Sequence, residues 1–269
     1  MKAKDSALRT LVDCGRQFYD RRWMWGTAGN LSLRLGPHPL EIAITPSGLN
    51  KGHLKKQDLL VVKDEKSQRK EKGASSRPNS LAVHRRQRAA VRGGLVPSAE
   101  TVIHQAVYRA LPGAGAVFHV HPLYSTLISN FYGHPRERRF LRMDWFEMMK
   151  GVGVGEEESA EVAILPNWQD VSLIARDLTD YLQTSPKTLP VVLIYNHGLT
   201  GWGATPDKAR NHLEIMEYVC QYLYLKKVMA ASGSAKILRR PGTARKDAIF
   251  ISEDFDAPLP EDIQRDFEA

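Results

Sequence analysis

The sequence, 269 residues long, contains only two cysteines and no long run of apolar residues. Cys14 and Cys220 lie outside any C-x-x-C motif, which excludes a scaffold built on disulfide bonds. No apolar stretch approaches the roughly 20 residues of a membrane-spanning helix. Charged residues interrupt the first five positions, so these lack the apolar core of a secretion signal. We therefore expect a protein of the reducing cytoplasm that does not bind membranes.

The formal net charge is +8, but the excess of basic residues is concentrated in one segment. Residues 64–92 contain nine Lys and Arg residues against three Asp and Glu residues. The first half of this segment is polar and without periodicity, so it cannot bury enough apolar surface to offset the entropy cost of ordering. We interpret residues 64–92 as a flexible basic insertion in a solvated loop, with weak binding of an acidic partner as the alternative. Specific binding of nucleic acid is not predicted.

Apolar periodicity indicates helices that alternate with short strands. The predicted helices cover residues 7–22, 98–111, 168–182 and 206–229, and another begins at Pro122. The predicted strands cover residues 30–35, 41–45, 59–62, 162–165 and 191–195, and another contains His119. Because the early strands are too close together for a purely parallel sheet, we predict an α/β fold with antiparallel pairs. One domain is expected over residues 1–231, followed by a polar tail over residues 232–269.

Three histidines form the most specific chemical pattern of the sequence. His119 and His121 lie in an F-H-V-H-P segment at the end of an apolar strand, and alternation along a strand points both side chains to one face. His197 follows another apolar strand in an N-H-G segment. Imidazole suits zinc and other late first-row metals, and three protein ligands leave a position open for water or substrate. The pattern favours a catalytic metal site, although a lone strand histidine is more often structural and the sequence does not make the two strands neighbours.

Three short loops contain the residue types that hold an anion. They cover residues 26–30, 45–48 and 97–100, and Lys51 follows the second loop. Glycines allow backbone N–H groups to approach a phosphate closely, and hydroxyl and amide side chains supply further donors. Turn chemistry alone explains any one of these loops, but together they predict a phosphorylated substrate.

The motifs G-T-x-G-N-x-S, T-P-S-G, P-S-A-E, H-V-H-P, E-M-x-K-G and N-H-G-x-x-x-x-G occur in this order along the chain. Their order resembles the class II aldolase and adducin head superfamily, and the resemblance covers about residues 7–230. It implies a single-domain α/β/α sandwich with a largely antiparallel central sheet, and a homotetramer with sites near the subunit interfaces. It also implies one zinc ion per subunit on His119, His121 and His197, and a phosphate pocket made by Asn30, Ser47, Gly48 and Ser98.

Two glutamates are expected to carry the proton chemistry. The segment E-M-M-K-G at residues 147–151 resembles the motif that carries the catalytic glutamate of a dehydratase subgroup of this superfamily. That subgroup removes water from a 1-phospho-2-ketose in methionine salvage, so the resemblance implies a zinc-dependent hydro-lyase with Glu147 as the proton-transfer group. Glu100 stands where the aldolases have their acid/base glutamate and some animal members have Cys. We expect Glu100 to assist or to position water.

Two other functions remain open from the sequence. A class II sugar-phosphate aldolase or epimerase would stabilise the same enediolate, so the metal ligands do not separate it from a dehydratase. A binding module without catalysis, like the adducin head, would have the same fold, but the presence of all three histidines disfavours it. Each glutamate also has a structural interpretation, since Glu100 would stabilise a helix N-terminus and Glu147 would be one charge at a helix start.

Overall fold

The computed structural model describes residues 2–37, 39–64, 94–144, 146–155, 158–185 and 187–234. Residues up to Lys227 form one compact unit, and of a second unit that begins at Val228 only the end of a helix is described. The predicted basic insertion after Asp64 and the predicted tail from residue 235 onward lie outside the described residues.

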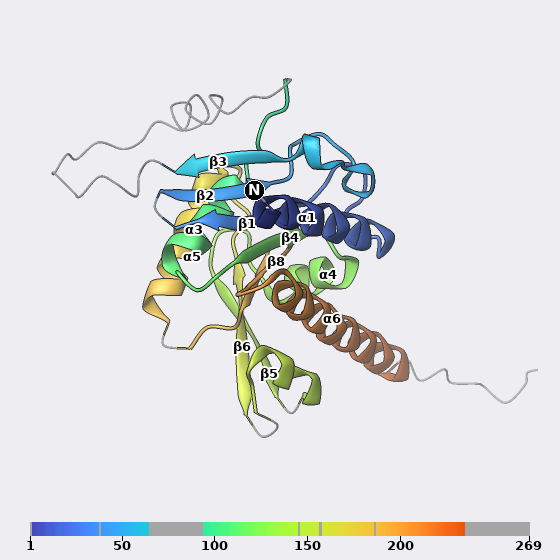
Figure 1. Cartoon of the computed structure of the whole chain (residues 1–269). Coiled ribbons are helices and arrows are strands. Elements are labelled where there is room, and N and C mark those ends of the chain that lie inside the picture. The colour runs from blue at the N-terminus through green and yellow to red at the C-terminus, as the bar shows by residue number, and fades with distance from the viewer. Residues whose placement is uncertain are drawn as a thin grey trace, which may run out of the picture. The chain divides into compact units, whose positions relative to one another are not determined.

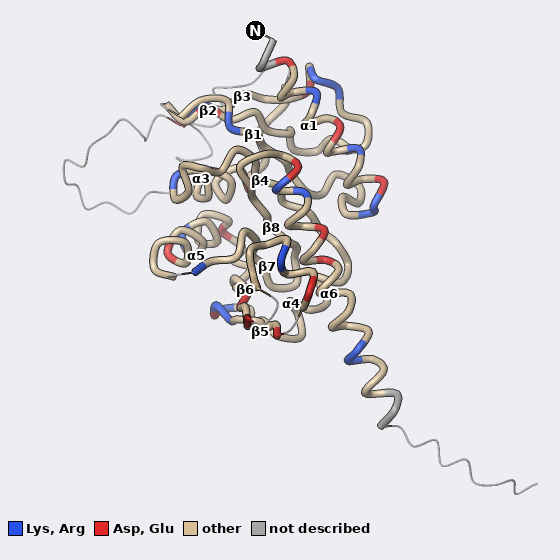
Figure 2. The backbone as a smooth tube through the Cα atoms, turned by 60° about the horizontal axis from the view of Figure 1, so that its bottom comes forward, with Lys and Arg blue, Asp and Glu red and all other residues tan. Residues whose placement is uncertain are grey.

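The centre of the compact unit is an eight-stranded sheet with the order β3-β2-β1-β4-β8-β7-β6-β5 (Figure 1, Figure 2). Only β6 and β7 pair in parallel, and every other neighbouring pair is antiparallel. The predicted α/β fold with a largely antiparallel sheet is therefore confirmed. The strands are β1 (Asn30–Gly36), β2 (Leu40–Ile44), β3 (Leu60–Asp64), β4 (Ala116–Val120), β5 (Arg139–Asp144), β6 (Ser159–Leu165), β7 (Val191–Ile194) and β8 (Gly198–Gly203).

Helices cover both faces of this sheet, as a sandwich requires. The α-helices are α1 (Lys2–Asp20), α3 (Thr101–Ala110), α4 (Leu123–Tyr132), α5 (Val171–Thr184) and α6 (Pro206–Ser234). Alternation along β4 sends Phe118 into the core under α1, α4 and α6, and Val117 into a second core under α3 and α5. Since both faces are buried, the central strands are apolar along their whole length.

Two strands were not predicted from the sequence, and β8 is the more instructive one. Its sequence G-L-T-G-W-G is too rich in glycine to read as a strand. The glycines allow α6 to approach the sheet closely, because a Cβ at Gly201 would lie 2.7 Å from a side-chain carbon of Leu213. At Gly203 a Cβ would lie 2.6 Å from the backbone nitrogen of Ala209. The other strand, β5, carries arginines on its exposed positions at one edge of the sheet.

Most predicted helices differ from the observed ones only at their ends. Asp170 caps α5 by accepting a hydrogen bond from the backbone N–H of Ser172, so this helix begins three residues later than predicted. The last helix continues to Ser234, beyond the predicted end at residue 229. Over the part of the chain that the structure describes, none of the helices has the length and apolar character to span a bilayer.

A buried carboxylate joins α6 to α4. The side chain of Glu217 accepts hydrogen bonds from the backbone N–H groups of Tyr124 and Ser125, at 3.0 and 2.9 Å, in the first turn of α4. These two N–H groups have no partner within their own helix. Burial raises the pKa of Glu217 to about 7, even though both hydrogen bonds favour the charged form. The Glu217 carboxylate therefore stabilises the start of α4, although its burial disfavours the charged form of the group.

The raised pKa of Glu217 predicts an unusual dependence of stability on pH. Because the pKa of Glu217 rises from 4.5 to about 7 on folding, the folded chain binds more protons than the unfolded chain between these values. The free energy of unfolding should therefore fall across this window as the pH rises, by roughly 2 to 3 kcal/mol through this group. Urea unfolding of the wild type and Glu217→Gln at pH 5 and pH 8 measures the difference. Parallel changes in the two proteins would contradict the assignment.

Candidate metal centre

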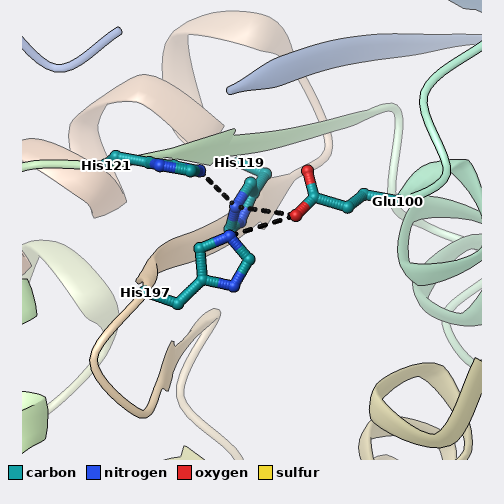
Figure 3. Close-up of side chains that lie close together, drawn as sticks. All are labelled: Glu100, His119, His121 and His197. Carbon is teal, nitrogen blue, oxygen red and sulfur yellow. Dashed lines mark hydrogen bonds and ion pairs between the residues drawn. The ribbon is translucent and has the colours of Figure 1, made fainter. Parts of the chain in front are cut away.

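Three histidines and one glutamate converge at one end of the central strands (Figure 3). One ligand atom from each of Glu100, His119, His121 and His197 lies within 4.8 Å of the others. Among the described residues this is the one group of three or more potential metal ligands. The structure thus brings the predicted histidine trio together and adds Glu100, which was predicted to assist or to position water, to it.

The order of the strands explains why the two histidine motifs meet. His119 lies on β4 between Asn30 of β1 and Thr200 of β8. His121 follows two residues later, just beyond the end of β4. His197 lies in the tight turn from β7 to β8, so the pairing of β8 with β4 brings this turn to the end of β4. A Cβ at Gly198 would lie 2.4 Å from the carbonyl oxygen of Val120, so only glycine permits this approach.

The ring nitrogens of the histidines face a common centre. The Nε2 atoms of His119 and His121 are 2.9 Å apart, and Nε2 of His197 lies 3.1 Å from Oε1 of Glu100. The hydroxyl of Thr200 lies 2.8 Å from Nδ1 of His119, so a hydrogen bond on this side leaves Nε2 with its lone pair toward the centre. Nδ1 of His197 is buried and has no hydrogen-bond partner among the described residues.

The electrostatic environment favours the protonation states that metal ligands need. Burial lowers the pKa of His119 well below its ordinary value and that of His121 to about 4, so both imidazoles are neutral at physiological pH. Burial alone would raise the pKa of Glu100, but contacts with His119, His197 and Asn30 hold it below its ordinary range. Neutral imidazole and ionised carboxylate are the forms that bind a cation. The donor set fits a divalent zinc-like metal.

The predicted phosphate loops also lie side by side. Pro46 and Pro97 form a β-bridge, and the N–H of Ser47 donates to the carbonyl of Val96 at 2.9 Å, so the loops of Ser47 and Ser98 are neighbours. Gly48 is exposed and left-handed, with a φ of 75°, and no described atom lies within 4 Å of where a Cβ would stand. There is thus room for a ligand beside Gly48.

Two predicted anion-binding side chains are occupied by contacts within the protein. The Asn30 amide nitrogen donates to Glu100 and lies 3.3 Å from Oγ of Ser98, and its oxygen lies 2.5 Å from Nε2 of His104. Lys51 is buried, and its ammonium donates to the carbonyl oxygens of Thr27 and Leu49, both at 2.8 Å. Lys51 therefore ties two loops together. No sequence motif indicates the contact of Thr200 with His119 or that of His104 with Asn30.

Glu147 lies outside the cluster of described metal ligands. It begins the 3₁₀ helix Glu147–Val152, its side chain is 74% exposed, and its nearest ion-pair partner is Lys150 at 3.6 Å. This short helix packs against α6, where the ring of Phe146 contacts Tyr222. Within one chain, the candidate catalytic glutamate is thus held on the outer surface.

Metal binding predicts a measurable gain in stability. A ligand that binds only the folded state stabilises it by about 2.7 kcal/mol at a free concentration of 100 times its Kd. Chelation should therefore lower the melting temperature, and zinc or cobalt should restore it with one ion per chain. His197→Ala should abolish this response, whereas His53→Gln should keep it, because His53 packs against Tyr19 and is not part of the cluster. Stoichiometric metal in His197→Ala would contradict the site.

Curated relatives resemble this chain over most of its length. A methylthioribulose-1-phosphate dehydratase from Microcystis aeruginosa is 36% identical over 215 residues, which are 80% of this chain and 93% of the relative. A protein from Nocardia farcinica described as a probable bifunctional methylthioribose-1-phosphate isomerase/methylthioribulose-1-phosphate dehydratase is 40% identical over 206 residues. That match covers 77% of this chain but spans only 33% of the longer bifunctional protein.

Solved structures show the same fold. An L-fuculose 1-phosphate aldolase superimposes with a TM-score of 0.60 and 20% identity, covering 83% of this chain and 87% of the aldolase. The sequence pattern of the Class II Aldolase and Adducin N-terminal domain matches residues 9–224, which include the complete histidine and glutamate cluster. The chain belongs to the class II aldolase and adducin N-terminal domain family.

Proposed function

We propose that this chain dehydrates 5-methylthioribulose 1-phosphate to 2,3-diketo-5-methylthiopentyl 1-phosphate and water, with one zinc ion per subunit. The convergence of three imidazoles and Glu100 beside the paired loops of Ser47 and Ser98 is the observation that carries the proposal. The choice of dehydration rests on relatives of that name, such as the one from Microcystis aeruginosa at 36% identity. The reaction belongs to methionine salvage, and we place it in the cytoplasm, where the buried free thiols of Cys14 and Cys220 stay reduced.

The chemistry requires one proton to leave C3 of the ketose and the C4 hydroxyl to leave as water. A divalent cation held by His119, His121 and His197 would polarise the C2 carbonyl and stabilise the negative charge that develops there. Thr200 keeps the His119 ring in the orientation that this requires. Glu100, next to the same centre, positions water or assists proton transfer. The enol that follows loss of water then tautomerises to the diketone.

The phosphate group is proposed to bind at the paired loops of Ser47, Gly48 and Ser98, with Asn30 beside them. Ser47 and Gly48 are exposed, and the left-handed backbone at Gly48 leaves its surroundings open. Ser98 lies between this loop and the metal centre, since its hydroxyl approaches the Asn30 amide. A phosphate here would leave the reacting carbons of the ketose near the histidines.

We propose that Glu147 is the principal proton-transfer group and that it acts from a neighbouring subunit of a homotetramer. The exposed faces of α4 and α6 support such an assembly, because they carry the large apolar side chains Phe131, Tyr218, Tyr222 and Leu225. Glu147 borders this surface through the contact of Phe146 with Tyr222. An interface on this surface would bring an exposed carboxylate toward another chain.

A class II sugar-phosphate aldolase or epimerase is the second candidate. It is favoured by the presence of Glu100 in the cluster and by the fold shared with an L-fuculose 1-phosphate aldolase. Both reactions begin with the same stabilised charge, and they diverge when either a carbon–carbon bond or the C4–oxygen bond breaks. Release of dihydroxyacetone phosphate from fuculose, rhamnulose or ribulose phosphates would identify the aldolase.

The dehydratase predicts turnover of one defined substrate. The zinc-loaded protein should convert 5-methylthioribulose 1-phosphate to a diketone, followed by its absorbance in the near ultraviolet. Loss of general acid–base catalysis should lower kcat of Glu147→Gln by about 10²- to 10⁴-fold, while zinc stays bound. His53→Gln, which changes a histidine outside the cluster, serves as the folded control. A metal-loaded, folded protein that leaves this substrate unchanged would exclude the function.

Action across a subunit interface predicts complementation between inactive variants. Glu147→Gln and His121→Ala should each be inactive as homotetramers. In randomly mixed tetramers about one site in four would combine an intact histidine trio with an intact Glu147 from its neighbour, so activity should return. Co-expression with two affinity tags and sequential purification isolates the mixed species. Mixed tetramers without activity would place Glu147 and the histidines of each working site in the same chain.

A further inference from the structure

We propose that His104 is a positioning residue that fixes the direction of the Asn30 amide and thereby aims the Glu100 carboxylate at the histidine cluster. The geometry of this contact does not depend on the substrate. The role of His104 rests on the proposed function only because it assigns a further residue to the same site.

A continuous row of buried, hydrogen-bonded polar groups runs between β1 and α3. Oγ of Ser32 lies 2.9 Å from the hydroxyl of Tyr108 and 2.7 Å from Nδ1 of His104. Nε2 of His104 lies 2.5 Å from Oδ1 of Asn30, whose amide nitrogen donates to Oε2 of Glu100. The other carboxylate oxygen of Glu100 lies 3.1 Å from His197. This row of hydrogen bonds therefore ends at the candidate metal centre.

Local geometry places these groups in one row. Positions 30 and 32 alternate along β1, so both side chains leave the same face of the strand. Positions 100, 104 and 108 are spaced by four residues at the start of and along α3, so they share one face of the helix. Asn30, Ser32 and His104 are all at most 2% exposed. Water therefore does not compete for these hydrogen bonds.

The directions of the hydrogen bonds at Asn30 and His104 follow from the last member of the row, Glu100. An ionised carboxylate can only accept, so the NH₂ end of the Asn30 amide must face Glu100 and the oxygen must face His104. Nε2 of His104 must then donate. Burial lowers the pKa of His104 to about 4, so the ring is neutral and its Nδ1 accepts from the hydroxyl of Ser32.

The other end of the row agrees with this polarity. With the hydroxyl hydrogen of Ser32 directed to His104, the Tyr108 hydroxyl donates in turn to the Ser32 carbonyl at 3.0 Å, or to its hydroxyl oxygen. All donors thus point toward Glu100. Bonds arranged head to tail in a buried environment strengthen one another.

His104 and Glu100, one at each end of the Asn30 amide, together prevent it from turning over. The two ends of an asparagine amide have nearly the same shape, so packing alone does not distinguish them. In the flipped state the Asn30 oxygen would face the Glu100 carboxylate, and its NH₂ group would face the N–H of His104. Both contacts would be repulsive and would leave buried groups without partners. A donor at Nε2 of His104 therefore selects the orientation that presents N–H to Glu100.

The tautomer of His104 can be measured directly. In ¹⁵N-labelled protein between pH 6 and 8, His104 should give the nitrogen shifts of a neutral ring protonated at Nε2, with and without zinc. Its signals are assigned by their loss in His104→Gln. A ring protonated at Nδ1, or a doubly protonated ring, would overturn the proposal, and this outcome is independent of enzymatic activity.

Paired substitutions separate positioning from packing. Glutamine at position 104 supplies an N–H near the place of Nε2, whereas methionine fills a similar volume without a donor. His104→Met should weaken cobalt or zinc binding by about 10- to 100-fold, as expected for loss of an outer hydrogen bond, and His104→Gln should restore most of it. Isothermal titration of folded protein measures the affinities without any substrate.

Tyr108→Phe is the matched control at the far end of the row. It removes a buried hydroxyl from the same network but leaves the contact between His104 and Asn30 intact. Its metal affinity should stay near that of the wild type even if its melting temperature falls. Wild-type affinity in His104→Met, or an equal loss in Tyr108→Phe, would show that the network only stabilises the packing of α3 against β1.

Discussion

The pairing of β4 with β1 on one side and β8 on the other is the interaction on which the site depends. At His119 the two neighbours are Asn30 and Thr200, and each contributes one contact to the metal centre. Thr200 fixes the imidazole of His119, and Asn30 holds the carboxylate of Glu100. The same pairing brings the turn that carries His197 against the end of β4. A shift of one residue in this register would turn His119 away from α3 and separate the ligands.

Burial keeps two histidines of the cluster neutral, but it also opposes ionisation of the carboxyl group of Glu100. The desolvation that keeps His119 and His121 neutral would by itself raise the pKa of Glu100, and contacts with His119, His197 and Asn30 reverse this tendency. A similar balance holds at Glu217, where burial is strong enough to raise the pKa of a carboxylate that accepts two backbone N–H groups. The helix that Glu217 caps begins two residues after His121, and Thr126 of this helix donates to the carbonyl of His197. Ligand positions and electrostatic balance are therefore set by the same few contacts.

The candidate metal centre, which suits several reactions, and the candidate proton-transfer group Glu147 lie on different parts of the fold. The histidines and Glu100 converge at one end of the central strands, whereas Glu147 lies exposed on a 3₁₀ helix against α6. Stabilising charge next to a carbonyl serves aldol cleavage and dehydration equally. We propose that the group that delivers the proton decides between them, and our candidate, Glu147, lies on a different part of the fold.

The sequence by itself determined the features that depend on neighbours along the chain. Alternation placed His119 and His121 on one face, and periodicity located α1, α3, α4, α5 and α6 to within a few residues at most ends. Tertiary structure alone decided that β8 lies beside β4, that Glu100 joins the histidines, and that the amide of Asn30 is held by His104. The physical reason is that strand order and the direction of a buried side chain follow from burial and hydrogen bonding between distant segments. The glycines of β8 illustrate this, because they disfavour a strand locally yet permit the close approach of α6 that stabilises it.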